Sequence, residues 1–337
     1  IKNGDEIEIK NFENNYKIRN DDKHQNVYAV KNDKEIPIYL NYKDNIVGMD
    51  ISNTEINKEL FTEDLFNLPS PHMQESHMMQ LRKRILTAVD EGYTGVVVTH
   101  GTDTLEETAY FLELTTNLSI PIVVTGAMRS SNEIGSDGLA NLRSSLIVAA
   151  SPESKDKGVV VVMNDEVHTA TYVTKTHTTN VATFQTPTFG PIGLVSKSEV
   201  IYFQRLLKQE YYPIEEVQTG VYLLKAYAGM DGLLLDAICE NKAKGVVIEA
   251  LGAGNLPPAT LPALQRCLEA GIPIVLVSRA FNGVTYDVYD YLGGGKQLRQ
   301  SGVIFTTGLS GQKARMKLSV LLSSGKSIEE IEKAFSC

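Results

Sequence analysis

A threonine followed directly by an aspartate, Thr102-Asp103, and a distant lysine, Lys175, are the residues of this chain whose types could do chemistry together. A hydroxyl is a weak nucleophile until a neighbouring base takes its proton, and a lysine whose pKa is lowered by burial is one such base. Asp103 would orient this lysine or hold a substrate ammonium. A Thr-Asp pair before a helix also serves as a simple helix cap, and a loop lysine is commonly solvated. Residue types alone therefore leave a structural role open.

The stretch around Thr102 predicts a strand, a tight turn and a helix in that order. Residues 96–99 (Val-Val-Val-Thr) are too apolar to alternate, which predicts a strand buried on both faces. Gly101 permits a sharp turn after it. Residues 104–107 (Thr-Leu-Glu-Glu) match a capping box, so a helix is expected from about Thr104. Thr102 and Asp103 would then lie at the carboxyl edge of a parallel sheet, where open α/β folds bind ligands.

The expected helix also favours an anionic ligand, because its first N–H groups and partial positive charge face the crevice. This suits a carboxylate or an oxyanion. Lys175 lies in a polar stretch, residues 172–180, that follows a third expected strand. We therefore expect Lys175 near the same sheet edge as Thr102.

Strand and helix patterns alternate through two parts of the chain and predict an α/β fold. The larger N-terminal domain is expected to hold a doubly wound parallel sheet, and a second, smaller α/β domain follows a polar linker at residues 205–220. We place the domains at residues 1–210 and 221–337. Residues 1–60 differ in texture, being rich in Asn, Lys, Asp and Glu, with short strand-like alternations at residues 6–9 and 36–40. The other expected elements are strands at 120–125, 158–163, 245–250, 274–277 and 303–305, and helices at 75–89, 138–150, 261–270 and 314–322.

Composition excludes several classes of protein. A chain of 337 residues favours two domains, and its net charge of −9 argues against a nucleic-acid partner. No apolar run is long enough to cross a bilayer, and no signal-peptide pattern is visible. Three widely spaced cysteines fit a reducing compartment, so we expect a cytoplasmic protein without membrane partners. The six histidines lack zinc-site spacing, and residues 293–295 (Gly-Gly-Gly) lack the context of a dinucleotide loop.

Several short motifs are specific enough to compare with a known family: Val98-Thr-His-Gly-Thr-Asp-Thr-Leu-Glu-Glu-Thr108, Thr125-Gly-Ala-Met-Arg129, Asn164-Asp165, Val173-Thr-Lys-Thr176, Gly254-Asn255 and Gln312-Lys-Ala-Arg315. In these motifs the chain closely resembles the bacterial-type L-asparaginases, from about residue 62 to the C-terminus. That family consists of homotetrameric, two-domain α/β amidohydrolases built from intimate dimers. The resemblance implies hydrolysis of L-asparagine, and more slowly of L-glutamine, without a metal or other cofactor.

The resemblance also implies roles for individual residues. Thr102 would be the second catalytic threonine of the family, in a hydrogen-bonded triad with Asp103 and Lys175. Asp103 would also hold the substrate α-amino group, and Ser70 the α-carboxylate. The backbone around Ala127 would lie near the scissile amide. Asn255 would reach the active site of a neighbouring subunit.

One motif of the family is not found. The family carries Thr-Gly-Gly-Thr ahead of the motif that contains Ser70, and the first of those threonines is the usual acyl-accepting nucleophile. The first threonine of this chain is Thr54, and no Gly-Gly pair occurs in the first ninety residues. The nearest counterpart, residues 36–49, places residues 42–45 (Tyr-Lys-Asp-Asn) over the motif.

Three explanations of this departure remain open. The chain could be an asparaginase whose first strand is replaced. It could be a catalytically impaired homologue that acts as an amino-acid-binding or regulatory module. Thr102 with Lys175 could also attack directly or activate water. An amidotransferase subunit that acts on acylated tRNA shares the fold, but the acidic chain lacks the basic patch that such a partner favours.

Overall fold

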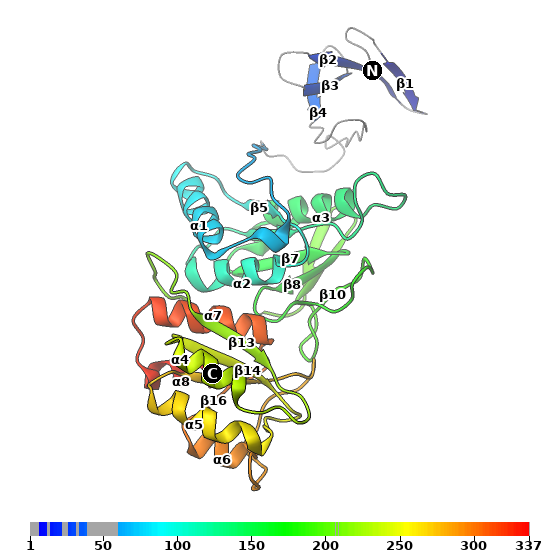
Figure 1. Ribbon diagram of the computed structural model, residues 1–337. Helices are drawn as coiled ribbons and strands as arrows, with labels where there is room; N and C mark the ends of the chain where they lie inside the picture. The colour runs from blue at the N-terminus through cyan, green and yellow to red at the C-terminus, as the bar shows by residue number, and fades with distance from the viewer. Residues whose placement is uncertain are drawn as a thin grey trace. The chain divides into compact units, whose positions relative to one another are not determined.

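The computed structural model describes residues 7–11, 14–21, 26–31, 34–38, 60–205, 207 and 209–336 (Figure 1). The chain divides into two compact units, Ile1–Asn57 and Lys58–Cys337. The first unit contains an antiparallel sheet in the order β1-β2-β3-β4. The expected strands are confirmed over their described residues, 7–9 by β1 and 36–38 by β4. The bounds are β1 (Ile7–Asn11), β2 (Asn14–Asp21), β3 (Asn26–Lys31) and β4 (Lys34–Ile38).

The second unit begins with a six-stranded sheet in the order β12-β11-β8-β7-β6-β5. Strands β5, β6 and β7 are parallel, as expected, but β8, β11 and β12 are antiparallel. The sheet is therefore mixed: β5, β6 and β7 form the expected parallel part, and β8, β11 and β12 extend it with antiparallel pairing. The bounds are β5 (Val96–Thr99), β6 (Ile122–Thr125), β7 (Val159–Met163), β8 (Glu166–Thr169), β11 (Gly193–Ser196) and β12 (Glu199–Tyr202).

The change of direction happens at Asn164 and Asp165. Both residues have positive φ angles, 52° and 61°. Two such residues in succession form the turn that best joins antiparallel strands, and Asn and Asp tolerate this conformation better than most residues. The chain therefore returns directly through β8 and forms no crossover helix after β7.

Helices cover both faces of this sheet (Figure 1). On one face α2 (Leu105–Thr115) packs its apolar residues, such as Phe111, against Val124 and Val161 of the sheet, and α1 (Glu75–Asp90) packs outside α2. The helix α3 (Gly138–Ala150) lies on the opposite face, against β5, β6 and β7. The helices expected at residues 75–89 and 138–150 are thus confirmed.

Two details at the start of this sheet differ from expectation. The side chains of residues 96–98 are only half-buried, because β5 is the last strand of the described sheet and has one neighbour, β6. The helix α2 begins at Leu105 as expected, but no capping box forms. The hydroxyl of Thr104 instead donates to the carbonyl of Ser70 at 2.8 Å. A tertiary contact has replaced the local cap.

The C-terminal half contains the expected second α/β domain, with a fully parallel sheet in the order β13-β14-β15-β16. Alternate residues of β14 face opposite sides: Val246 and Ile248 pack toward α4 and α5, and Val247 packs toward α7 and α8. Because β14 and β15 are each buried on both faces, their sequences are nearly continuous apolar runs without polar alternation. The bounds are β13 (Val221–Lys225), β14 (Gly245–Ala250), β15 (Ile274–Ser278), β16 (Ile304–Phe305), α4 (Leu233–Glu240), α5 (Leu261–Glu269), α6 (Gly295–Gln300), α7 (Gly311–Ser323) and α8 (Ile328–Phe335).

The two halves of this unit meet where α7 packs along α2. A small hairpin of β9 (Thr174–Lys175) and β10 (Phe184–Gln185) projects from the larger sheet. Short 3₁₀ turns complete the described elements: η2 (Ser70–His72), η3 (Pro152–Ser154) and η4 (Pro258–Thr260). No described helix is both long enough and apolar enough to span a membrane.

Candidate active site

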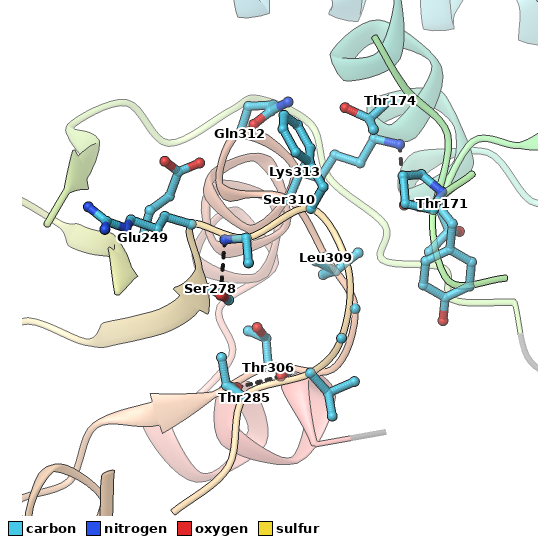
Figure 2. A pocket seen from close by; sticks show the side chains of 18 of the residues that line it. Thr171, Thr174, Glu249, Ser278, Thr285, Thr306, Leu309, Ser310, Gln312 and Lys313 are labelled. Atoms are coloured by element: carbon cyan, nitrogen blue, oxygen red, sulfur yellow. Dashed lines mark hydrogen bonds between the residues drawn. The ribbon is translucent and has the colours of Figure 1, made fainter. Parts of the chain in front are cut away.

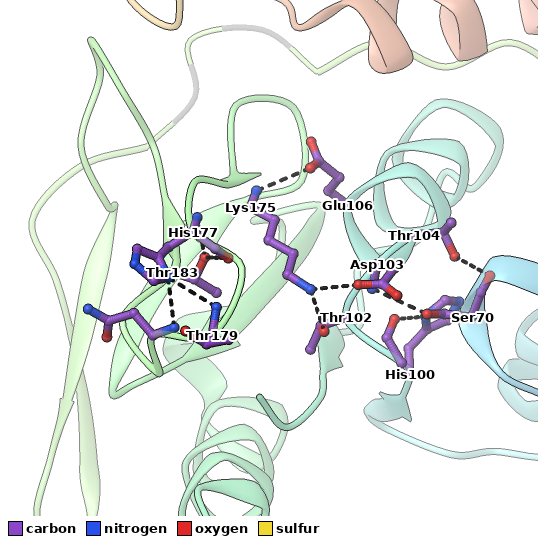
Figure 3. A network of polar contacts seen from close by, with 12 residues as sticks. Ser70, His100, Thr102, Asp103, Thr104, Glu106, Lys175, His177, Thr179 and Thr183 are labelled. Atoms are coloured by element: carbon purple, nitrogen blue, oxygen red, sulfur yellow. Dashed lines mark hydrogen bonds and ion pairs between the residues drawn. The ribbon is translucent and has the colours of Figure 1, made fainter. Parts of the chain in front are cut away.

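The ammonium of Lys175 reaches both Thr102 and Asp103 (Figure 3). Its Nζ donates to Thr102 Oγ1 at 2.9 Å and to Asp103 Oδ1 at 2.7 Å. The side chain of Lys175 is 17% exposed, whereas that of Asp103 is 59% exposed. The hydroxyl, the amine and the carboxylate that the sequence singled out are therefore in direct contact, and the carboxylate remains open to a ligand.

Lys175 reaches this position by a longer path than expected. The strand β8 runs back along β7 until Ala170 N bonds to Val159 O, at the start of β7. The chain then turns toward α2, where Glu106 Oε1 accepts from Thr174 Oγ1 and Lys175 N, each at 3.1 Å. The buried carboxylate of Glu106, in the first turn of α2, thus anchors β9 beside Thr102. No sequence signal distinguishes Glu106, because a carboxylate in the first turn of a helix is common.

Ser70 lies against the same turn. Ser70 Oγ accepts from Asp103 N at 3.2 Å, and Ser70 is only 6% exposed. A Cβ on Gly101 would stand 2.8 Å from both the Cβ and the Oγ of Ser70. Gly101 is therefore required for this close approach, as well as for ending the strand. The structure brings Ser70 to Asp103 across 33 residues of sequence, and to Thr104 across 34.

The segment around Ala127 lies next to Thr102. A Cβ on Gly126 would be 2.4 Å from His100 O and 3.3 Å from the methyl group of Thr102. The buried side chain of Asn141, in α3, donates to Gly126 O at 3.0 Å, and its own oxygen accepts from Asn164 N at 2.9 Å. Asn141 therefore ties the Gly126 turn to the β7–β8 turn. No sequence signal distinguishes Asn141, since α3 carries other polar residues.

Ala127 itself is exposed, and the chain beyond it is held by a carboxylate. Asp137 accepts from Met128 N at 3.0 Å and from Arg129 N at 2.9 Å. Both bonds are charge-assisted and hold the backbone that follows Ala127. The peptide groups around Ala127 are thus fixed from both sides, by Asn141 and by Asp137.

His100 lies in the turn between β5 and α2 and contacts both sides of it. Its Nδ1 lies 2.7 Å from Gly101 O and its Nε2 lies 2.9 Å from Thr108 Oγ1. Burial lowers the pKa of this imidazole, and the bond to Gly101 O partly offsets that effect. A neutral ring that bonds to both groups braces the turn between β5 and α2.

The structure does not bring Asn255 to Thr102. Asn255 lies in the loop after β14, where its Oδ1 accepts from Gly295 N at 3.2 Å and its backbone pairs with Leu251. A cavity of about 140 Å³ is lined on one side by Thr171, Tyr172 and Thr174, close to Lys175 in the chain, and on the other by the C-terminal domain. Its walls include Glu249, Ser278 and Lys313 (Figure 2).

Comparison with known proteins agrees with this architecture. The family described as "Asparaginase, N-terminal" matches residues 15–208, and the "Glutaminase/Asparaginase C-terminal domain" matches residues 220–335. This chain belongs to the asparaginase family. It is 39% identical to an L-asparaginase of Bacillus licheniformis over 262 residues, which is 77% of this chain and 81% of that protein. It is 40% identical to a probable L-asparaginase of Deinococcus radiodurans over 275 residues, 80% of this chain and 84% of that protein.

A solved structure supports the same assignment. A probable cytoplasmic L-asparaginase from Campylobacter jejuni superposes with a TM-score of 0.78 at 32% sequence identity, over 85% of this chain and 92% of that one. The family resemblance seen in the short motifs is therefore confirmed. Residues 42–45, which the sequence comparison placed over the family's Thr-Gly-Gly-Thr motif, lie outside the described residues.

Proposed function

We propose that this member of the asparaginase family hydrolyses the side-chain amide of L-asparagine to L-aspartate and ammonia, with L-glutamine as a slower substrate. The observation that carries the proposal is the contact of Lys175 Nζ with both Thr102 Oγ1 and Asp103 Oδ1. A hydroxyl beside an amine that an acid orients is the arrangement needed to activate an oxygen nucleophile.

Substrate binding follows from the charges and exposure of the site. The open carboxylate of Asp103 would accept the α-ammonium of asparagine. Ser70 Oγ and the first N–H groups of α2 would receive the α-carboxylate, which the helix N-terminus favours. Ala127 backbone groups would orient the scissile amide, and an N–H there would stabilise the oxyanion.

The chemistry then needs a base for the Thr102 hydroxyl. The step requires Lys175 as its neutral amine, with its ammonium proton passed to solvent before the attack, while Asp103 binds the substrate ammonium. The amine takes the Thr102 proton while Oγ1 forms a bond to the amide carbon. Collapse of the tetrahedral adduct breaks the carbon–nitrogen bond, and Lys175 returns the proton to the departing ammonia. Water, activated by the same amine, hydrolyses the ester and restores Thr102.

Three further features belong to the proposal. The functional domains are residues 1–210 and 221–337. Asn255 contributes to a neighbouring subunit's site in a homotetramer built from intimate dimers, and sedimentation would test this assembly. We place the protein in the cytoplasm, in line with the name of the Campylobacter jejuni relative.

The decisive experiment measures ammonia released from L-asparagine by the purified protein. Thr102→Ala and Lys175→Met should each lower kcat by roughly 10³-fold or more, as loss of a nucleophile or its base does in other hydrolases. Thr219→Ala, at an exposed threonine of the 205–220 linker, should leave the rate unchanged. Wild-type protein that releases no ammonia would refute the proposal.

A second function has its own support in the sequence. No Thr-Gly-Gly-Thr occurs between Ile1 and Ser70, where the family resemblance leads us to expect the nucleophile motif. A binding or regulatory module would retain Asp103 and Ser70 for ligand recognition without turnover. Calorimetry with L-asparagine and L-aspartate separates the two functions. Saturable heat without ammonia release favours the binding module, and ammonia release excludes it.

A further inference from the structure

A second lysine, Lys313, is buried close to the candidate site. It lies in the first turn of α7 and is only 1% exposed. Figure 2 shows its side chain extending from α7 toward Thr171. Its Nζ donates to Ala170 O at 2.6 Å, to Thr171 O at 3.2 Å and, through a very short bond, to Val173 O. An ammonium has three N–H donors, and each of these has a partner on one short segment.

That segment, residues 170–175, leads directly to Lys175. On its other side Glu106 accepts from Thr174 Oγ1 and Lys175 N. The segment is therefore held from two sides. Its carbonyls accept from the ammonium of Lys313, and the hydroxyl of Thr174 and the N–H of Lys175 donate to the carboxylate of Glu106. Lys313 comes from the C-terminal domain and Glu106 from α2, so the segment is held from both domains.

The ammonium of Lys313 is buried, so its charge needs hydrogen-bond partners and nearby carboxylates. Burial lowers the pKa of Lys313 to about 8, and the carboxylates of Glu106 and Glu107 oppose that shift. His168 and the ring of Tyr110 also face the ammonium. A buried ammonium without hydrogen-bond partners destabilises the folded protein. Three carbonyls within residues 170–173 must therefore keep pointing at Lys313 Nζ.

We propose that Lys313 is a positioning residue that sets the place of Lys175 relative to Thr102 and Asp103. The inference rests on the proposed function, because it concerns the same catalytic amine. Lys313 itself contacts neither Thr102 nor Asp103 and acts through residues 170–175. A displacement of about 1 Å at a catalytic group can cost on the order of 100-fold in rate.

The first test replaces Lys313 with methionine, an unbranched side chain that lacks the ammonium and is one heavy atom shorter. Lys313→Met should lower kcat for asparagine by about 100-fold while KM changes little, because Asp103 and Ser70 stay in place. Lys317→Met is the matched control. Lys317 is a buried lysine one turn further along α7, bonded to Glu210 and to Ala334 O. This variant should lose stability but keep its kcat when folded.

The second test separates positioning from general damage. If Lys313 acts through Lys175, the double variant Lys313→Met/Lys175→Met should be no slower than Lys175→Met alone. If the losses multiply, or if Lys313→Met keeps the wild-type kcat, the inference is overturned.

A third measurement stays informative if the wild-type protein proves inactive and the proposed function fails. A crystal structure of Lys313→Met should show Lys175 Nζ moved out of hydrogen-bonding range of Thr102 Oγ1. A structure that retains this contact would refute the positioning role, whatever the activity.

Discussion

Lys175 Nζ lies 2.9 Å from Thr102 Oγ1, although 73 residues separate the two in the sequence. The contact depends on the hairpin turn at Asn164 and Asp165, which returns the chain through β8, and on Glu106, which then anchors β9. An amine at hydrogen-bonding distance can either accept the Thr102 proton or act only as a fixed positive charge. The two roles predict different values of kcat when Lys175 is replaced by arginine.

Replacement of Lys175 by arginine distinguishes them. Arginine keeps the positive charge opposite Asp103 but cannot release a proton at working pH. We expect Lys175→Arg to lose roughly 10²–10⁴-fold in kcat, the range for a general base. Lys326→Arg is the control, because Lys326 forms an exposed ion pair with Glu330 at 2.8 Å. An arginine variant that retains wild-type kcat would show that Lys175 contributes only charge.

Gly101→Ala tests the close approach of Ser70. The new Cβ would lie 2.8 Å from the Cβ and Oγ of Ser70, so Ser70 must shift and its bond to Asp103 N must weaken. Overpacking of this kind costs about 1–3 kcal/mol of unfolding free energy, and KM for asparagine should rise. Denaturation and steady-state kinetics measure the two effects. In a Ser70→Gly background the same substitution should cost much less stability, and an equal cost would contradict the steric explanation.

Asn141→Ala tests the support of the Gly126 turn. The change leaves Gly126 O and Asn164 N without their side-chain partner, and each of these part-buried bonds contributes about 1 kcal/mol to stability. Because Gly126 lies beside Thr102, kcat should fall as well. Ser145→Ala on the same helix is the control, since the Ser145 hydroxyl bonds only within α3, to Asn141 O. Equal kinetic effects of the two variants would argue against a role for the turn.

Glu113→Gln tests a buried carboxyl that has no part in the proposed chemistry. Burial raises the pKa of Glu113 from 4.5 to about 7, and the bond from Val159 N only partly offsets this. The folded state therefore favours the neutral acid. Its contribution to stability is fully present below about pH 4.5 and is lost as the pH rises to about 7. A shift of this size corresponds to roughly 3 kcal/mol.

The measurement compares unfolding free energies at pH 5 and pH 8. The amide of Glu113→Gln cannot ionise, so the variant should lose less stability than wild type between the two values. Glu113→Ala should also lose this pH dependence, but it should be less stable at pH 5 because Val159 N loses its acceptor. A wild-type pH dependence that persists in both variants would mean that other groups cause it.

The sequence by itself determined the local elements and the types of the reacting residues. The unbroken apolar runs of β6, β7, β14 and β15 predict strands with no solvent-facing side, because a strand covered by helices on both faces has no polar alternation to show. The motifs at residues 98–108 and 173–176 pointed to the family, and they predicted Thr102, Asp103 and Lys175 as reactive groups. These features are local, so they can be read along the chain.

Only the tertiary structure decided how the site is held. The antiparallel return of β8 depends on two left-handed residues, and the order of the strands depends on pairing between distant segments. Thr104 matches a capping box locally, yet its hydroxyl donates to the carbonyl of Ser70, 34 residues away, which also accepts from Met73 N. Glu106, Asn141 and Lys313 are ordinary polar residues in the sequence. They matter because folding buries them, and a buried charge or amide must find partners wherever the chain places them.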